Sequence, residues 1–320
     1  MRHVSGSAER KRSEEVVFGD PKTQQDAQEF FSYVMQSLDD ETNKRRDITA
    51  PTASKRSQDP AFSTLHRAVR FWQEHTSRND SVVSKYWRGI EAGTVSCQRP
   101  GCGFKSTTFE VLDNISCSVA QDTGDGYHPD LSASLQAYTK LERLDDLWDC
   151  DRCKANGLGR SPATKRTAYA RLPERLMITL KRTGAGDSAR GGTPAKISQR
   201  FEFPIRDLNM EPYFVDPADR VIDRTDGEVA RMYEQERQFH PQDKYDCYAA
   251  ICHTGSSFRS GHYIAYVRDY ESSDPTDWLK FNDTNVSRVK VGSGSGADHV
   301  AWLYGKQDTQ AYVLLYRRKP

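Results

Sequence analysis

The sequence of 320 residues lacks both a long apolar run and an excess of either charge. Its mean hydropathy of −0.80 argues against a membrane-spanning helix. The 46 lysines and arginines face 45 aspartates and glutamates, so the net charge is +1 and no overall basic field attracts nucleic acid. We therefore expect a protein that inserts into no membrane and binds no nucleic acid.

The first residues also lack a secretory signal, because no apolar segment follows the basic residues of 1–15. We expect an intracellular protein, in the cytoplasm, the nucleus or both, with reduced cysteines. Residues 1–20 are charged and poorly patterned, which predicts a disordered N-terminal arm. The rest of the chain is long enough to bury one large core or two modest ones.

Four of the seven cysteines form two close pairs, Cys97 with Cys102 and Cys150 with Cys153. The turn-forming Pro100-Gly101 step lies within the first pair, and the second pair is a compact CDRC knuckle. Because reduced thiolates at such spacings hold a tetrahedral cation, we predict one structural Zn²⁺ on these four residues. The alternative is four unrelated buried thiols.

The other three cysteines, Cys117, Cys247 and Cys252, lie in apolar or alternating segments. None follows a small-residue turn that leads into a helix, the setting that exposes a thiolate of low pKa. Cys247 shares strand parity with apolar neighbours and is expected to be a buried small hydrophobic residue. No nucleophile is evident among the three.

Hydrophobic periodicity predicts a mixture of helices and strands. A helical stripe begins after Thr23, the expected N-cap, with Asp26 in the first turn; its apolar positions are Ala27, Phe30, Phe31, Val34, Met35 and Leu38. Further helices are expected over 62–72, 132–144 and 228–238. Strands are expected over 172–182, 201–204 and 311–318, and a surface loop over 184–194.

The segment 245–286 carries a histidine at the start of one strand and an amide and a carboxylate at the end of the next. His262 shares a strand face with Ile264 and Tyr266. Gly261 has no Cβ, so a substrate backbone can approach the imidazole closely. The alternative is an ordinary strand histidine in a hairpin.

Seven segments in a fixed order resemble the ubiquitin-specific protease family of deubiquitinases. They are QQDAQEFF (24–31), the paired cysteines, LPERLMITLKR (172–182), FEFP (201–204), the histidine segment (245–267), WLKFNDTNV (278–286) and AYVLLYRR (311–318). The resemblance implies an α+β, papain-like cysteine protease fold described as a hand. On that template the catalytic domain covers 21–320, with a partial thumb over 21–90, zinc-bearing fingers over 91–170 and a β-sheet palm over 171–320.

The resemblance also implies a thiol mechanism that cleaves bonds at the C-terminal glycine of ubiquitin. His262 matches the general base, and Asn282 matches the group that orients it, with Asp283 as the second candidate. Alternatively, the last two residues only turn the chain. The residues expected to bind the ubiquitin tail are Gln25, Asp26, Glu29, His253, Gly261 and Tyr263. A solvated helix face and a packed strand pair remain alternatives for these residues.

The sequence departs from the family at its start, because it contains no glycine- and asparagine-rich box with a catalytic cysteine. The nucleophile, the oxyanion donor and the first thumb helix are therefore expected to be missing, and the chain alone is expected to be inactive. Three interpretations stay open: a truncated sequence of an active deubiquitinase, a ubiquitin-binding pseudo-deubiquitinase, and a zinc-dependent scaffold or nucleic-acid protein unrelated to ubiquitin. The expected partners are ubiquitin and ubiquitinated proteins, and the expected state is a monomer.

Overall fold

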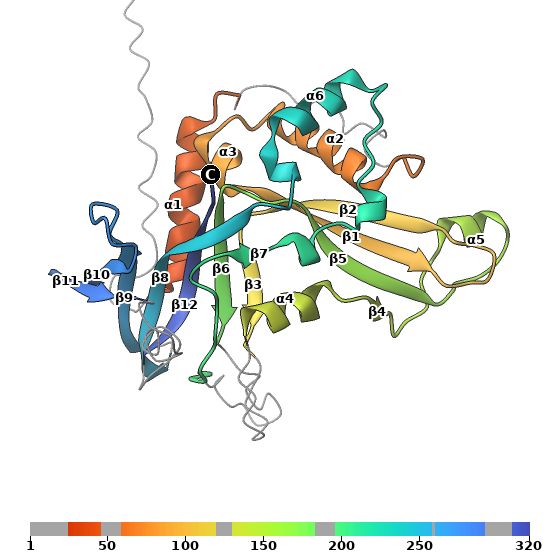
Figure 1. Ribbon diagram of the computed structural model, residues 1–320. Helices are drawn as coiled ribbons and strands as arrows, with labels where there is room; N and C mark the ends of the chain where they lie inside the picture. The colour runs from red at the N-terminus through yellow and green to blue at the C-terminus, as the bar shows by residue number, and fades with distance from the viewer. Residues whose placement is uncertain (1–24, 46–58, 120–129, 183–195, 258–259, 292–308) are drawn as a thin grey trace, which may run out of the picture.

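The computed structural model describes residues 25–45, 59–119, 130–182, 196–257, 260–291 and 309–320 (Figure 1). The helices are α1 (Ala27–Thr42), α2 (Thr64–Thr76), α3 (Val82–Trp87), α4 (Leu131–Thr139), α5 (Asp151–Ala155) and α6 (Gly227–Gln235), with 3₁₀ turns η3 (Glu211–Tyr213), η4 (Pro217–Asp219) and η5 (Arg237–Phe239). The predicted arm over 1–20 and the predicted loop over 184–194 lie outside the described residues.

The strands form two sheets that share one hydrophobic core. The smaller sheet has the order β2-β1-β5-β4, from β1 (Gly89–Cys97), β2 (Lys105–Leu112), β4 (Glu142–Arg143) and β5 (Ala163–Arg171). The larger has the order β11-β10-β9-β8-β12-β6-β3, with β7 beside β8. Its strands are β3 (Ile115–Ser118), β6 (Arg175–Lys181), β7 (Leu208–Asn209), β8 (Lys244–Ser257), β9 (Ser260–Arg268), β10 (Asp277–Asn282), β11 (Asn285–Lys290) and β12 (Thr309–Arg318).

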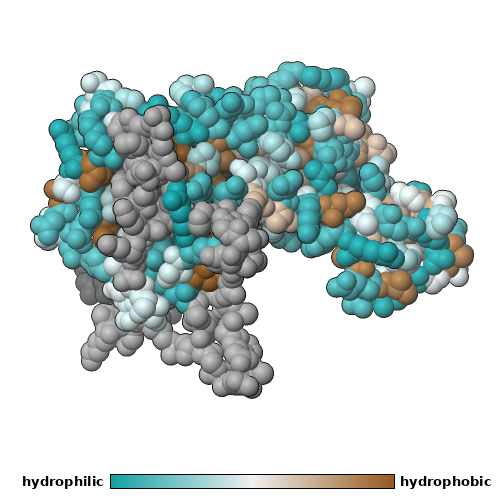
Figure 2. All heavy atoms as spheres, turned by 60° about the horizontal axis from the view of Figure 1, so that its bottom comes forward, coloured by the Kyte–Doolittle hydropathy of each residue, from teal (hydrophilic) through white to brown (hydrophobic). Residues whose placement is uncertain are grey.

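The helices and sheets are arranged as an α+β fold with a projecting arm. The smaller sheet extends away from the larger one and carries α5 at its far end (Figure 1). Figure 2 brings the lower side forward and shows this end standing clear of the rest of the molecule. Among the described helices, none is long and apolar enough to cross a bilayer.

Helix α1 begins at Ala27, and its N-cap is Asp26 rather than the predicted Thr23. One carboxylate oxygen of Asp26 accepts hydrogen bonds from the backbone N–H groups of Gln28 and Glu29, at 2.8 and 3.1 Å. The predicted apolar stripe is only partly buried. Phe31 packs against Trp87 of α3, but the Phe30, Val34 and Leu38 side chains are exposed.

Two other predicted elements differ from the structure. The helix expected over 132–144 ends at Thr139, and β4 follows it; the apolar side chains of Tyr138 and Leu141 are exposed. Residues 201–204 form no strand, since Glu202 makes a single bridge with Asp130. The side chains of Phe201 and Phe203, which suggested a strand, are buried in the core although their backbone forms a loop. Their burial therefore accounts for the apolar pattern without a strand.

The predicted subdivision into thumb, fingers and palm stays a prediction. Strand β3 lies within 91–170, the range expected for the fingers, but pairs in parallel with β6 of the larger sheet. The remaining predicted elements, over 62–72, 172–182, 228–238 and 311–318, correspond to α2, β6, α6 and β12.

A buried ion pair joins the smaller sheet to the helical layer above it. Arg171 of β5 is 2% exposed, donates to Glu236 at 2.9 Å, and lies over the ring of Trp72 at 3.8 Å. Its guanidinium also donates to the backbone carbonyl of Arg88. The charge of Arg171 is thus removed from water and depends on Glu236 for neutralisation.

Glu236→Ala should lower the free energy of unfolding by about 2–3 kcal/mol, because the buried Arg171 charge loses its carboxylate. Urea unfolding followed by circular dichroism measures the change. The control is Glu234→Ala, which removes a carboxylate paired with Arg224 where both side chains are more than 60% exposed. That change should cost less than about 0.5 kcal/mol. Equal costs for the two variants would contradict a structural role for the buried pair.

Candidate active site and metal centre

His262 and Asn282 meet where the start of β9 lies beside the end of β10. The two strands are antiparallel neighbours, with Phe281 opposite Ala265. This pairing brings Asn282 Oδ1 to 2.6 Å from His262 Nε2. The carboxylate of Asp283 lies 3.7 Å from the same nitrogen and is 76% exposed. Asn282 is therefore the closer partner, and Asp283, with a φ of 52°, occupies the turn that follows.

This contact defines the tautomer of His262. An amide oxygen only accepts hydrogen bonds, so Nε2 carries the proton that it donates to Asn282. Nδ1 then holds the free lone pair of the neutral ring. The His262 side chain is 42% exposed, so an incoming group can reach it. The arrangement suits a general base that is oriented by an amide.

Gly261 is required by the neighbouring strand. A Cβ at this position would lie 2.3 Å from the backbone oxygen of Thr254 and 2.6 Å from Nε2 of His253. The sequence suggested that glycine allows a substrate backbone to approach the imidazole. The structure gives a different reason: the His253 ring of β8 occupies the space that a side chain would need.

His253 is completely buried, at 0% exposure. Its Nδ1 lies 2.9 Å from Nζ of Lys196, which also donates to the backbone oxygen of Gly255 at 2.6 Å. Tyr263 packs edge-on against the ring, with the centroids 4.9 Å apart. Burial, and next the positive charge of Lys196, lower the pKa of His253 to about 4. The His253 ring is therefore neutral at pH 7 and is packed like an ordinary strand histidine. Its contact with a bound ubiquitin tail stays a prediction.

The other predicted tail-binding residues lie at the start of α1 and face β9 and β12. Gln25 and Asp26 are partly buried, and Glu29 is exposed. Asp26 is already engaged, because the hydroxyl of Tyr312 donates to its second carboxylate oxygen at 2.6 Å. Burial, and then the charge of Asp26, raise the pKa of Tyr263 to about 12.

Two residues that contact the predicted site residues were not identified from the sequence. Tyr312 was predicted only as a strand residue, and nothing in the sequence pairs it with an aspartate 286 positions away. Lys196 was not singled out at all, although its ammonium group sets the polarity around His253. Both contacts arise from chain segments that meet only in the folded protein.

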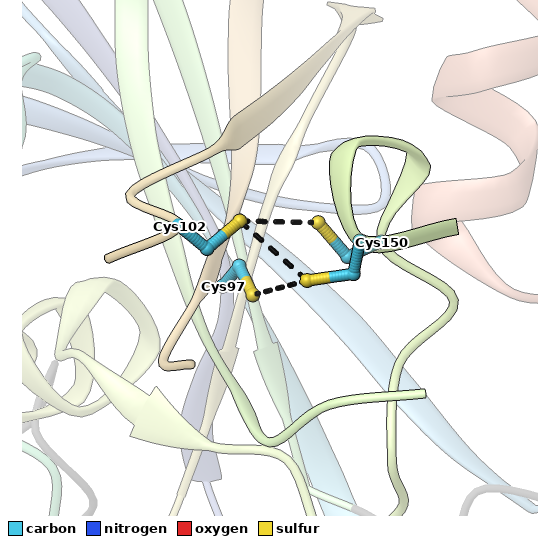
Figure 3. A group of neighbouring side chains, drawn as sticks. Cys97, Cys102 and Cys150 are labelled. Carbon is cyan, nitrogen blue, oxygen red and sulfur yellow. Dashed lines mark hydrogen bonds between the residues drawn. The ribbon is translucent and has the colours of Figure 1, made fainter. Parts of the chain in front are cut away.

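The four paired cysteines converge at the far end of the smaller sheet (Figure 3). All four are buried, and their sulfur atoms lie within 4.8 Å of one another. The closest separations are 3.6 Å for Cys102–Cys153, 3.7 Å for Cys102–Cys150 and 3.8 Å for Cys97–Cys153.

These separations fit one metal ion. They are too long for a disulfide, in which the sulfurs lie about 2.05 Å apart. They match the edge of about 3.8 Å of a tetrahedron whose metal–sulfur distance is about 2.3 Å. Gly101, with a φ of 77°, makes the turn that returns the chain from β1 to Cys102. The cluster can therefore hold a tetrahedral metal ion.

The remaining three cysteines are buried, as predicted for Cys247. Cys117, Cys247 and Cys252 are at most 2% exposed. Burial raises the pKa of Cys117 and Cys252 to about 12, and it also raises the pKa of Cys247. All seven cysteines of the sequence are thus buried, and these three are held as neutral thiols.

The low pKa of His253 makes stability depend on pH. Its pKa is about 4 when folded and about 6.5 when unfolded, so the unfolded chain binds the proton first as the pH falls. The stability that this residue contributes is complete above about pH 6.5 and is lost as the pH falls toward 4. At about pH 5 the loss should be about 2 kcal/mol.

Urea unfolding at about pH 7.5 and 5 tests this dependence. The control variant His253→Gln keeps a neutral acceptor for Lys196 and should lose less stability than the unchanged chain over the same interval. An identical loss in both proteins would show that another group is responsible.

Known proteins share both the sequence pattern and the fold. The sequence profile of the family "Ubiquitin carboxyl-terminal hydrolase" matches residues 9–316. Human ubiquitin carboxyl-terminal hydrolase 21 is 28% identical over 296 residues, which is 88% of this chain and 46% of the relative. Chicken ubiquitin carboxyl-terminal hydrolase 2 is 26% identical over 92% of this chain and 68% of its own length.

The solved structures support the fold. A chain in the structure of the SAGA Ubp8/Sgf11/Sus1/Sgf73 DUB module bound to ubiquitin aldehyde superposes with a TM-score of 0.59 and is 21% identical in sequence. The match covers 93% of this chain and 50% of the solved chain. This chain spans about half the length of the curated relatives; its match covers 46% of human ubiquitin carboxyl-terminal hydrolase 21. Since the family profile covers nearly the whole chain, the protein belongs to the ubiquitin carboxyl-terminal hydrolase family, in its ubiquitin-specific protease group.

Proposed function

We propose that this chain binds ubiquitin and carries the base half of a thiol hydrolase site that cleaves bonds at the C-terminal glycine of ubiquitin. The observation that supports this is the contact of 2.6 Å between His262 Nε2 and Asn282 Oδ1. A base held in this tautomer takes a proton from a thiol through Nδ1 and returns it to a leaving amine. Asp283 supports the imidazolium as a second, more distant charge.

In this proposal the nucleophile is not among the seven cysteines of the sequence. Four of them form the metal cluster, and the other three are buried with raised pKa values. A thiol attacks as the thiolate, so a buried neutral thiol is a poor nucleophile. The same observation favours a second candidate function, a ubiquitin-binding module without hydrolysis.

The metal in the cysteine cluster is proposed to be Zn²⁺. Four thiolates in a tetrahedron are a typical structural zinc set, and the buried cluster leaves no open position for catalysis. The ion would join the turn after β1 to α5 and so hold the end of the smaller sheet together. Intracellular location and a monomeric state remain predictions that accompany this function.

A ubiquitin probe with a C-terminal electrophile tests the site. We expect the 320-residue chain to form no covalent adduct on denaturing gels, because no cysteine of the chain is an exposed thiolate. Fluorescence anisotropy with labelled ubiquitin should nevertheless detect binding. Ubiquitin that lacks its last two glycines is the matched control and should bind about tenfold more weakly.

Three results separate the alternatives. An adduct abolished by Cys117→Ser, Cys247→Ser or Cys252→Ser would contradict the assignment of these thiols as inert. Equal binding of full-length and shortened ubiquitin would contradict a tail-binding cleft. Absence of any ubiquitin binding would contradict the proposed function as a whole.

Elemental analysis of the purified chain should find about one zinc per molecule. Cys97→Ser and Cys150→Ser should each lose the metal and lower the melting temperature, since structural zinc can contribute about 10 kcal/mol to folding. Cys117→Ser, which changes a buried thiol outside the cluster, is the control and should keep the metal. A zinc content near zero in freshly prepared, folded protein would refute the proposal.

A further inference from the structure

A buried serine contacts the cysteine cluster of Figure 3. Ser161, in the segment before β5, is 0% exposed. Its Oγ atom lies 3.1 Å from Sγ of Cys97 and 4.0 Å from Sγ of Cys153. A completely buried hydroxyl requires a hydrogen-bond partner, and in the described part of the chain these two sulfur atoms are the partners found. Ser161 therefore belongs to the surroundings of the proposed metal site.

The hydrogen bond between Ser161 and Cys97 has one direction when the cluster holds a metal ion. A free thiol can donate a hydrogen bond, but a metal-bound thiolate has lost its proton. The Ser161 hydroxyl then donates and the Cys97 sulfur accepts. Because the contact with Cys97 is the shorter of the two, Cys97 is the main acceptor.

The loaded cluster has a negative charge that the protein must offset. The charge of four thiolates exceeds that of one Zn²⁺ by two. All four cysteines are buried, and Phe104 and Trp148 pack against them with their rings stacked. Charge removed from water in this way is costly unless hydrogen-bond donors face it. In such surroundings a donor to sulfur has a larger electrostatic effect than it has in water.

Other groups around the cluster offset part of this charge. The backbone N–H of Arg99 donates to Cys97, and that of Phe104 donates to Cys102. The Arg152 guanidinium donates to the backbone carbonyl of Cys102 at 2.8 Å, so its charge lies near the cluster although it binds oxygen. The serine hydroxyl adds a side-chain donor that contacts sulfur directly.

The backbone of Ser161 is held from two sides. Its N–H donates to the carbonyl of Trp148 at 2.9 Å, and its carbonyl accepts from the N–H of Trp148 at 2.8 Å. Two residues later, Ala163 is opposite Cys97 in the register of β5 and β1. The first contact joins Ser161 to the segment that leads to Cys150, and the second joins it to the strand that ends at Cys97. The backbone therefore holds the hydroxyl against the cluster, between its two pairs of cysteines.

We propose that Ser161 is a positioning residue of the metal site, whose hydroxyl donates to the Cys97 thiolate and strengthens metal binding. This inference rests on the proposed Zn²⁺ in the cluster. The hydrogen bond orients the Cys97 side chain and offsets part of the negative charge of the thiolates. Ser161 thereby determines how tightly the far end of the smaller sheet retains its ion.

Competition with a fluorescent zinc chelator tests this role in the full chain. Ser161→Ala should bind Zn²⁺ about tenfold more weakly, as is usual when a hydrogen bond to a metal ligand is lost. Ser161→Thr keeps the hydroxyl and should bind Zn²⁺ more tightly than Ser161→Ala. Ser84→Ala is the matched control and should leave the zinc affinity unchanged, because Ser84 of α3 is 2% exposed and its hydroxyl contacts Ser81.

Absorption spectra of the Co²⁺-loaded chain separate an effect on the Cys97 sulfur from a loss of packing. A hydrogen bond stabilises the sulfur lone pair, so its removal in Ser161→Ala should move the thiolate-to-cobalt charge-transfer band to longer wavelength. Ser161→Thr and Ser84→Ala should keep the band of the unchanged chain.

Each outcome decides between the inference and the zinc proposal beneath it. If Ser161→Ala keeps both the zinc affinity and the band of the unchanged chain, the role of Ser161 is wrong and the proposed zinc site stands. A weaker affinity with an unmoved band would also overturn this role, since altered packing would then explain the loss. If the unchanged chain binds no zinc, the proposed metal site and this inference both fail.

Discussion

The antiparallel pairing of β8, β9 and β10 is the constraint on which the candidate site depends. Strand β9 lies between the other two, so its first residues contact β8 on one side and the end of β10 on the other. The first contact demands glycine at 261, because the His253 ring fills the adjacent space. The second brings Asn282 to His262. This register therefore places the neutral, buried His253 behind the site and the oriented, accessible His262 within it.

Helix α1 is joined to this sheet by polar contacts at its start and by Phe31, which packs against the apolar cluster of β6, β8 and β12. Asp26 caps the helix with one carboxylate oxygen and accepts from Tyr312 of β12 with the other. Meanwhile Phe30, Val34 and Leu38 remain exposed, so much of the apolar stripe does not stabilise the described fold. Asp26 therefore has a structural role that is independent of any ligand.

Sequence patterns were most informative where chemistry depends on residues close in the chain. The spacing of Cys97 with Cys102 and of Cys150 with Cys153 indicated the cluster, because short turns bring such thiols together. Alternating apolar residues likewise predicted β6 and β12. Helix ends were less predictable: the helix after Asp130 ends at Thr139, where tertiary packing leaves Tyr138 and Leu141 exposed.

The sequence by itself determined the family, the metal-ligating cysteines, and the residue types of the base and its orienting amide, since each is encoded in local segments. Only the tertiary structure decided that Asn282 lies closer than Asp283 to His262 and that His253 is buried. The physical reason is strand register. A shift of one residue reverses the face on which every side chain lies, and the long-range pairing that sets the register cannot be read from local pattern.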